Sequence, residues 1–205
     1  CIIARVVTKG ENMKTILRPA AGFAAIFCSS MALAAYPERP VRIIVPYPPG
    51  GNIDITARTI SPGLSEALGV QVVIDNRGGA GGTIGSEMAA KAPPDGYTML
   101  MGSTGTLATS PALYPKANID PLKDYAYTSL VSVVPLVAIV HPALRARTLK
   151  EFIALAKSRP GTLTMGSAGT GTSNHLTGEL FQTYTRTKLV HIPYKGSGPA
   201  LVDIM

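Results

Sequence analysis

The residues best suited to nucleophilic chemistry are Ser173 and His175, two positions apart in the run GTSNH. A serine acts as a nucleophile when a nearby base takes its proton and a third group orients that base. The G-x-S-x-G motif that presents such a serine between a strand and a helix is missing here. The pair therefore predicts either a secreted hydrolase or, as the structural alternative, a helix that Ser173 caps and in whose first turn His175 packs.

The remaining patterns do not support a metal ion or a nucleotide cofactor. His141, His175 and His191 are the only histidines, and their spacing is not that of an H-x-x-x-H or H-E-x-x-H metal site. No G-x-x-x-x-G-K-[ST] phosphate loop occurs, and Ile84 stands where a dinucleotide loop that begins at Gly79 needs its last glycine. We expect a protein with no cofactor.

Hydrogen-bond donors, by contrast, recur throughout the chain in glycine-rich segments that each follow an apolar run. If those runs are parallel strands, the segments meet at the carboxyl ends of the strands, where ligands of open α/β sheets bind. Helix N-termini at this edge offer unpaired backbone N–H groups that suit phosphate, sulfate or carboxylate. Many donors with few acids, bases or nucleophiles predict a binding site rather than an active site. The segments are PYPPGGNID (46–54), NRGGAGGTIG (76–85), MGSTGTLA (101–108), GSAGTGTSNH (166–175) and PYKGSGPA (193–200).

Two charged residues in these segments have two interpretations each. Asp54 falls at the start of an expected helix, where the helix dipole favours a carboxylate, so it either caps the helix or contacts a ligand. Lys195 either pairs with an anionic ligand or is a solvated loop lysine.

The elements that would position these segments alternate between short β-branched runs and helical patterns, which predicts an α/β fold with mostly parallel sheets. Helical spacing of apolar residues predicts one helix around Ile53–Leu64, which the Pro62-Gly63 pair should kink or shorten. A second helix, around Leu149–Ala156, opens with the capping box TLKE. The expected strands are 41–45, 70–74, 97–101, 130–140, 163–165 and 189–192.

The run 130–140 is long for a strand and contains Pro135. Pattern alone leaves two alternatives: one strand that crosses from a first domain to a second, or two short strands joined by a turn. The last residues, GPALVDIM, read as the first turns of a helix, so we expect a truncated product. A non-functional fragment is therefore a third hypothesis.

The amino-terminal residues predict export. Residues 13–34 carry Lys14 and Arg18, then an apolar run that ends in Ala32-Leu33-Ala34, as in a cleavable signal peptide. Residues 1–12 lie upstream of the expected initiator and look like a mis-called extension. Both cysteines of the chain fall in this part. The chain has 46% hydrophobic residues, which is enough for a core, whereas its lysines and arginines do not cluster and it has no tryptophan. We expect no nucleic-acid partner.

Several segments of the chain together resemble the periplasmic substrate-binding receptors of tripartite tricarboxylate transporters, also called the Bug family. The resemblance runs from Tyr36 to Met205. It rests on YPERPVRIIVPYPPGGNIDITAR, VVIDNRGGAGGTIGSEMAAKAPPDGYTMLMGSTGT, DPLKDY, GSAGTGTSNHLTGELF and VHIPYKGSGPAL.

The resemblance implies a two-domain, hinged "Venus flytrap" fold of the periplasmic-binding-protein type, with domain 1 at 35–134 and an incomplete domain 2 at 135–205. It also implies a periplasmic, monomeric receptor, not an enzyme, that captures a di- or tricarboxylate, an amino acid or a related organic acid. Its partners would be the transporter's membrane subunits or a sensor protein. The ligand-binding residues implied are Tyr47, Pro48, Gly50, Gly51, Asp54, Ser103, Thr104, Ser167, Ala168, Thr172, Ser173, His175, Tyr194 and Lys195.

This chain departs from the family pattern in two ways. Asn52-Ile53 stands where the family has a third glycine or small residue and a threonine, which bears on ligand choice or loop shape. Family members also continue well beyond the position of Met205, through residues that finish the second domain and return to complete the first. We therefore expect an incomplete sheet and half of the hinge.

Overall fold

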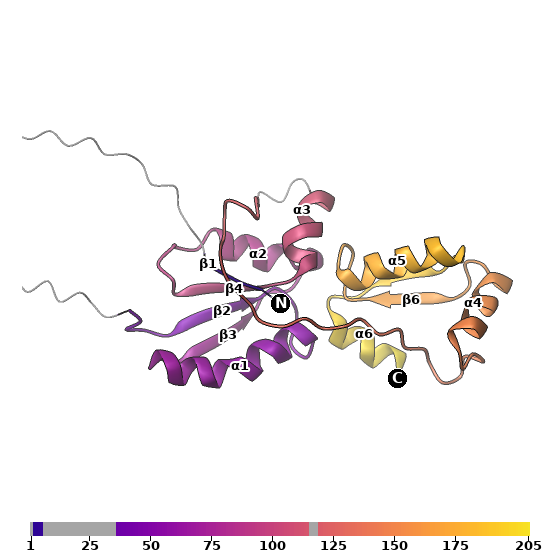
Figure 1. Ribbon diagram of the computed structural model, residues 1–205, viewed down its shortest axis with the longest axis horizontal. Helices are drawn as coiled ribbons and strands as arrows, with labels where there is room; N and C mark the ends of the chain where they lie inside the picture. Colours follow the sequence, from indigo (N-terminus) through magenta and orange to yellow (C-terminus); the bar gives the residue numbers. More distant parts are fainter. Residues whose placement is uncertain (1, 6–35, 115–118) are drawn as a thin grey trace, which may run out of the picture.

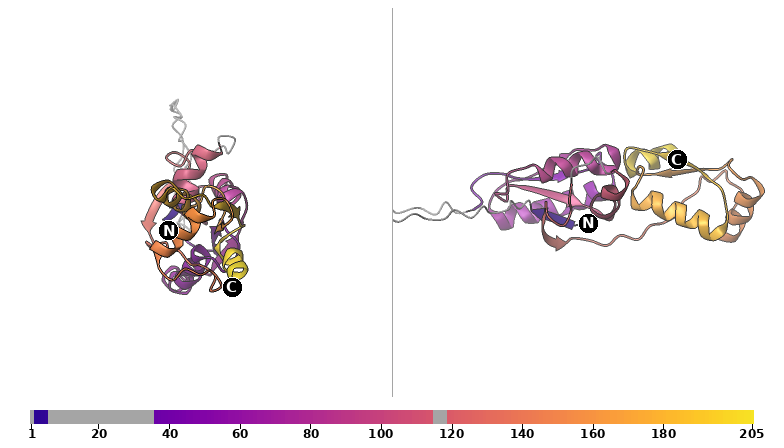
Figure 2. Two further views of the ribbon diagram at one scale, coloured as in Figure 1. Left: turned by 90° about the vertical axis from the view of Figure 1, so that its right-hand side faces the viewer. Right: turned by 90° about the horizontal axis from the view of Figure 1, so that it is seen from above.

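The computed structural model describes residues 2–5, 36–114 and 119–205, and its strands form two separate sheets (Figure 1). We call the five-stranded sheet with its helices the first lobe, and the two-stranded sheet with its helices the second lobe. The two lobes lie one after the other along the long axis of the molecule (Figure 2). The predicted signal peptide, residues 13–34, lies outside the described residues.

The first lobe is built on a sheet of strand order β3-β2-β4-β1-β5. Strand β2 pairs in parallel with β3 and with β4, whereas β1 pairs antiparallel with β4 and β5. The predicted strands 41–45, 70–74 and 97–101 correspond to β2, β3 and β4, and the latter two are displaced by one or two residues. The strands of this sheet are β1 (Ile2–Arg5), β2 (Val41–Val45), β3 (Val72–Asn76), β4 (Thr98–Gly102) and β5 (Ala126–Leu130).

Alternate residues of the central strands enter two separate cores. Ile43 packs on the face covered by α1 (Asn52–Leu68), together with Ala57 of that helix. Its neighbour Ile44 packs on the opposite face with Ala89 of α2 (Thr83–Ala90). Because both faces of the strand are covered, β2 is apolar at every position except Arg42, as is typical of buried parallel strands. Shorter helical turns follow at η1 (Ala80–Gly82), η2 (Gly105–Thr109) and α3 (Ser110–Leu113).

Of the two effects predicted for Pro62-Gly63, a kink or a shortened helix, the shortening is wrong, because helix α1 runs unbroken through Pro62. Proline has no N–H group and leaves the carbonyl four residues earlier, that of Arg58, without its helical donor. The Ser61 hydroxyl donates to this carbonyl at 3.2 Å. A side chain thus replaces the missing backbone donor.

The second lobe has a small parallel sheet of two strands, which match the predicted runs 163–165 and 189–192. The predicted capping box is confirmed in part, because the Glu151 N–H donates to the Thr148 hydroxyl at 3.2 Å. Helices α5 and α6 bury none of their residues, so this lobe packs less tightly than the first. Its elements are α4 (Leu149–Ser158), β6 (Thr164–Ser167), α5 (Ser173–Thr185), β7 (Val190–Pro193) and α6 (Ser197–Ile204).

Residues 131–141 form neither the long strand nor the two short strands that were predicted. The strand ends at Leu130, and the chain then crosses from the first lobe to the second without regular structure (Figure 1). A strand needs a neighbour that completes its hydrogen bonds, and neither sheet of the described residues has a strand paired with this segment. Pro135 also removes one donor. One of the two alternatives thus included a crossing at this segment, but neither gave its conformation.

Strand β1 is an addition that the sequence did not predict. It occupies the position between β4 and β5, with Ile3 opposite Met101 on one side and Ser129 on the other. Apart from the pairs made by β1, all pairing is parallel, so the predicted α/β class with mostly parallel sheets is confirmed. Among the described residues, no helix combines the length and apolar character needed to cross a membrane.

Candidate functional site

Tyr47 lies in the loop just after β2, where the two lobes meet. Its ring is 8% exposed, and its hydroxyl donates to the Gly81 carbonyl at 3.2 Å and shares a 3.2 Å hydrogen bond with the Ser103 hydroxyl. Burial raises the pKa of the Tyr47 hydroxyl, and the bond to Ser103 offsets only part of that effect. The phenol therefore remains a neutral donor that ties together the loops after β2, β3 and β4.

Asp54 fixes the glycine-rich loop from behind. Its carboxylate is 2% exposed and accepts hydrogen bonds from the Gly50 N–H at 2.9 Å, from Arg58 Nε at 3.0 Å and from Asn76 Nδ2 at 2.9 Å. Burial raises the pKa of this carboxyl, but the bonds from Arg58, Gly50 and Asn76 outweigh burial and hold the pKa below its usual value. Asp54 is thus a charged anchor of the loop and of the start of α1.

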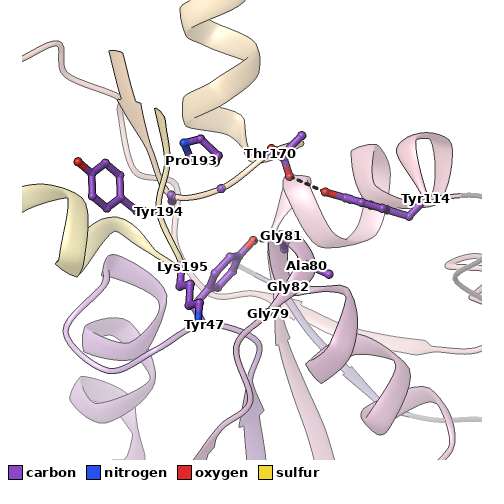
Figure 3. Close-up of a pocket in the computed structure, with 12 residues that line it drawn as sticks. Tyr47, Gly79, Ala80, Gly81, Gly82, Tyr114, Thr170, Pro193, Tyr194 and Lys195 are labelled. Carbon is purple, nitrogen blue, oxygen red and sulfur yellow. Dashed lines mark hydrogen bonds between the residues drawn. The ribbon is translucent and has the colours of Figure 1, made fainter. Parts of the chain in front are cut away.

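Two cavities lie between the lobes, and Tyr47 and Ala168 line both of them. The larger cavity has a volume of about 270 Å³ and the smaller one about 190 Å³. The larger one is lined by Tyr47, Gly51, Asn52, Ile53, Thr56, Ser103, Thr104, Leu130, Ser132, Val133, Val134, Leu136, Ala168, Thr172, Ser173, Asn174 and Ser197. The smaller one is lined by Tyr47, Gly79, Ala80, Gly81, Gly82, Tyr114, Ala168, Gly169, Thr170, Pro193, Tyr194 and Lys195 (Figure 3).

The loop 79–82 forms one wall of the smaller cavity with an unusual backbone. All four of its residues have positive φ angles, including the non-glycine Ala80 at 48°. Tyr114, at the end of α3, faces Thr170 of the second lobe, and its hydroxyl donates to the Thr170 carbonyl at 3.5 Å (Figure 3). This loop was noted in the sequence as donor-rich, but no ligand-binding residue was assigned to it.

Glycines allow the lobes to approach within backbone contact. A Cβ atom at Gly81 would lie 2.6 Å from the Thr170 carbonyl oxygen, and one at Gly105 would lie 3.2 Å from the Thr172 Cα. Likewise, a Cβ atom at Gly51 would lie 2.9 Å from the Ser197 hydroxyl. Side chains at these positions would hold the lobes further apart.

The second-lobe loop ends at Thr172, which caps α5. The Thr172 hydroxyl accepts from the His175 N–H at 3.5 Å, while Ser173 is the first residue inside the helix. The prediction that Ser173 is the capping residue is therefore wrong by one position. The hydrolase alternative also loses its base, because His175 Nδ1 accepts from the Gly171 N–H at 3.2 Å and Nε2 faces Glu179 at 3.7 Å.

This assignment of the cap gives a direct prediction. Thr172→Ala should lower the free energy of unfolding by about 1 kcal/mol because it removes the cap, whereas Ser173→Ala should change it by less than about 0.5 kcal/mol. Urea unfolding followed by circular dichroism would measure both. Equal effects of the two changes would contradict the assignment.

The structure gathers most of the predicted ligand-binding residues around the two cavities. The larger one is lined by Gly51, Ser103, Thr104, Thr172 and Ser173, and the smaller one by Tyr194 and Lys195, while Tyr47 and Ala168 line both. The other five line neither cavity and instead support the loops. These are Pro48, Gly50, Asp54, Ser167 and His175.

The donors around the cavities are almost all neutral. The cation among the lining residues is Lys195, which is exposed and forms no ion pair with any described residue. Its neighbour Tyr194 instead donates to Asp203. Within the described residues there is also no group of three or more His, Cys, Asp or Glu side chains that could hold a metal ion. Hydroxyls, amides and one lysine suit a small, weakly charged anion with polar groups.

Comparison with known proteins assigns the family. The model of the tripartite tricarboxylate transporter family receptor matches residues 56–205. The chain belongs to this receptor family. A relative from Bordetella pertussis, the protein BugT, is 42% identical over 187 residues, which cover 88% of this chain and 57% of BugT. Family membership confirms the predicted resemblance, since the matched family is one of transporter receptors.

Solved structures agree with this assignment. MatC from Rhodopseudomonas palustris, with bound malate, matches with a TM-score of 0.77 and 31% identity over 82% of this chain and 57% of MatC. A second R. palustris protein, solved with adipate, matches with a TM-score of 0.73 and 36% identity. The match covers 82% of this chain and 56% of the R. palustris protein. These matches confirm the predicted periplasmic-binding-protein fold. The chain spans between half and three fifths of the length of the relatives it matches.

Proposed function

We propose that this chain forms the ligand-capturing part of a periplasmic receptor that binds a small organic carboxylate between its two lobes. The observation that carries the proposal is the convergence of loops from both lobes on adjoining cavities that share Tyr47 and Ala168. The relatives solved with malate and adipate support a carboxylate as the ligand. The receptor would pass its ligand to the membrane subunits of a tripartite tricarboxylate-type transporter or to a sensor protein.

The lobes would act as two domains, 35–134 and 135–205, that close on the ligand. The crossing segment 131–141 supports this division, because it connects the two sheets without belonging to either. Export through the predicted signal peptide of residues 13–34 would bring the receptor to the periplasm, where it would work as a monomer.

Recognition would combine one charge with many neutral donors. Lys195 would attract a carboxylate of the ligand, while backbone N–H groups of loop 79–82 and the hydroxyls of Thr104 and Ser173 would orient it. Hydrogen bonds that involve an ionised partner are about twice as strong as neutral ones. The apolar wall, formed by Leu130 and its neighbours in the larger cavity, would contact the ligand's carbon chain.

Thermal unfolding of the full 205-residue chain tests the proposal. The panel would contain malate, adipate, citrate, glutamate and benzoate, with adipamide as an uncharged control of the same shape as adipate. A carboxylate at about 100 times its Kd should stabilise the chain by about 2.7 kcal/mol, and adipamide should not stabilise it. If none of these carboxylates raises the unfolding temperature, the proposed function is wrong for this chain.

Lys195 can be tested separately with a matched lysine. Lys195→Gln should weaken binding of the carboxylate found in this screen roughly tenfold, which corresponds to about 1.4 kcal/mol, because it removes the cation at the smaller cavity. Lys150→Gln is the control, since Lys150 is also exposed but lies in α4 and lines neither cavity. Isothermal titration calorimetry measures both, and equal affinities would exclude a role for Lys195.

A further inference from the structure

Two histidines from different elements stack beside the second-lobe loop 167–172. His175 belongs to the first turn of α5 and His191 to β7, and their ring centroids lie 3.9 Å apart with an interplanar angle of 19°. No local pattern pairs them, because they are sixteen positions apart and have no metal-site spacing. Their stacking is therefore a product of the fold.

Each ring hydrogen-bonds a different end of the loop. His191 Nε2 lies 2.7 Å from the Ser167 hydroxyl, and His175 Nδ1 accepts from the Gly171 N–H at 3.2 Å. Between and beside these two points, Ala168 and Thr172 form part of the cavity walls. The position of both cavity residues thus depends on a loop whose two ends are held by the stacked rings.

We propose that His175 and His191 act together as positioning residues, a histidine clamp that holds loop 167–172 against the cavities while His175 is neutral. The inference deepens the proposed function, since the loop lines the proposed ligand site. The test of the clamp needs no ligand, however, so the clamp and the proposed function can fail independently.

The requirement for a neutral His175 follows from the direction of its hydrogen bond. The Gly171 N–H is a donor, so Nδ1 of His175 must present a lone pair, and the ring proton then resides on Nε2. If Nδ1 were protonated, its N–H group would face the Gly171 N–H group, and two donors cannot form a hydrogen bond. The loop would lose its attachment at Gly171.

Only a few charged groups act on the clamp. Glu179 of α5 lies 3.7 Å from His175 Nε2, whereas loop 167–172 and β6 contain no titratable side chain. Burial lowers the pKa of His191, and repulsion from His175 lowers it further, while Glu179 opposes them without reversing the direction. The folded lobe therefore favours a neutral His191.

The lowered pKa of His191 makes the stability of the folded lobe depend on pH. A base whose pKa is lower in the folded chain gives stability that is fully present above its unfolded pKa, about 6.5, and is lost as the pH falls through the folded pKa. Acidification should therefore destabilise the lobe at His191, which holds the Ser167 end of the loop.

Hydrogen exchange of the Gly171 amide measures how firmly the clamp holds this end of the loop. It is followed by NMR on the ¹⁵N-labelled full chain without ligand. Its protection factor should fall about fivefold between about pH 7.5 and about pH 5, the size expected for the loss of one hydrogen bond. The amide of Leu100 is the control, because Leu100 lies in β4 of the first lobe and the histidines lie in the second. It reports any general loss of stability.

Two variants separate positioning from simple packing. In His175→Asn the side-chain oxygen takes about the place of Nδ1 and cannot titrate, so Gly171 should stay protected at both pH values. His175→Leu has no acceptor, so protection should be low at both. Asparagine and histidine have similar helix propensities, which keeps α5 comparable.

The proposal is overturned if wild-type protection of Gly171 is the same at both pH values, or if His175→Asn shows the same loss on acidification. It is also overturned if His175→Leu retains wild-type protection. Should His175→Leu fail to fold, as judged from the Leu100 amide, the wild type and His175→Asn decide the question by themselves.

Discussion

Asp54→Ala should lower the free energy of unfolding by about 3 kcal/mol, one of the two largest effects expected in this chain. The carboxylate is almost fully buried, and its removal would leave the Gly50 N–H and the Asn76 amide without their acceptor. An unsatisfied buried donor costs more than the lost bond itself contributes, because the donor has given up water without gaining a partner. Urea unfolding monitored by circular dichroism measures the change.

The charge of Asp54 adds a pH signature to this effect. Its pKa is lower in the folded chain than in the unfolded one, so its stabilisation is fully present above the unfolded pKa, about 3.9. It is lost as the pH falls through the folded pKa. The difference in stability between wild type and Asp54→Asn should therefore shrink on acidification, since asparagine keeps the shape but not the charge.

Arg58→Met is the matched control for Asp54. The Arg58 side chain is 52% exposed, so the loss of its ion pair with Asp54 should cost less than about 1 kcal/mol. If Arg58→Met were as destabilising as Asp54→Ala, the ion pair and not the backbone anchor at Gly50 would be the main contribution of Asp54.

Capture of a carboxylate should also weaken in Asp54→Ala, because the loop that starts at Tyr47 would lose its fixed shape.

The parts of this fold that could be predicted are those recorded in local patterns. Strand β2 is apolar except for Arg42 and is followed by proline and glycine, and α4 begins with a capping box, so both were located from the sequence. The joints after the strands were recognised as donor-rich for the same reason. A parallel sheet brings such joints to one edge, and loops from both lobes do meet at the two cavities.

The parts that could not be predicted depend on neighbours that are distant in the sequence. The segment 131–141 has β-branched residues but no strand beside it, so propensity alone gave the wrong conformation. Strand β1 pairs with β4 across nearly a hundred residues, which no local pattern records. The same holds for the stack of His175 on His191. Each of these contacts exists only once the chain has folded.

Gly81 decides how closely the two lobes can approach, and Gly81→Ala is the second change with a large expected effect. The new Cβ would lie 2.6 Å from the Thr170 carbonyl oxygen, a distance that real Cβ contacts do not reach, so backbone on one side must move. The lobes should separate around Tyr47, and carboxylate binding should weaken by more than about tenfold, since a ligand held from both sides loses one of them.

Gly69→Ala separates this contact from backbone strain. Gly69 has φ 68° and ψ 10° at the end of α1, Gly81 has φ 65° and ψ 17°, and a Cβ at Gly69 would meet nothing within 4 Å. Both variants should therefore pay the same conformational cost of about 1 kcal/mol for a left-handed alanine. Only Gly81→Ala should also disturb the contact between the lobes.

Small-angle X-ray scattering and unfolding experiments on the two variants distinguish these contributions. Gly69→Ala should keep the wild-type radius of gyration and lose only stability, whereas Gly81→Ala should show a larger radius as well. If both variants keep the wild-type radius and bind carboxylates equally well, the approach of Gly81 to Thr170 does not control closure. The lobes would then be held together by other contacts, such as that of Gly105 with Thr172.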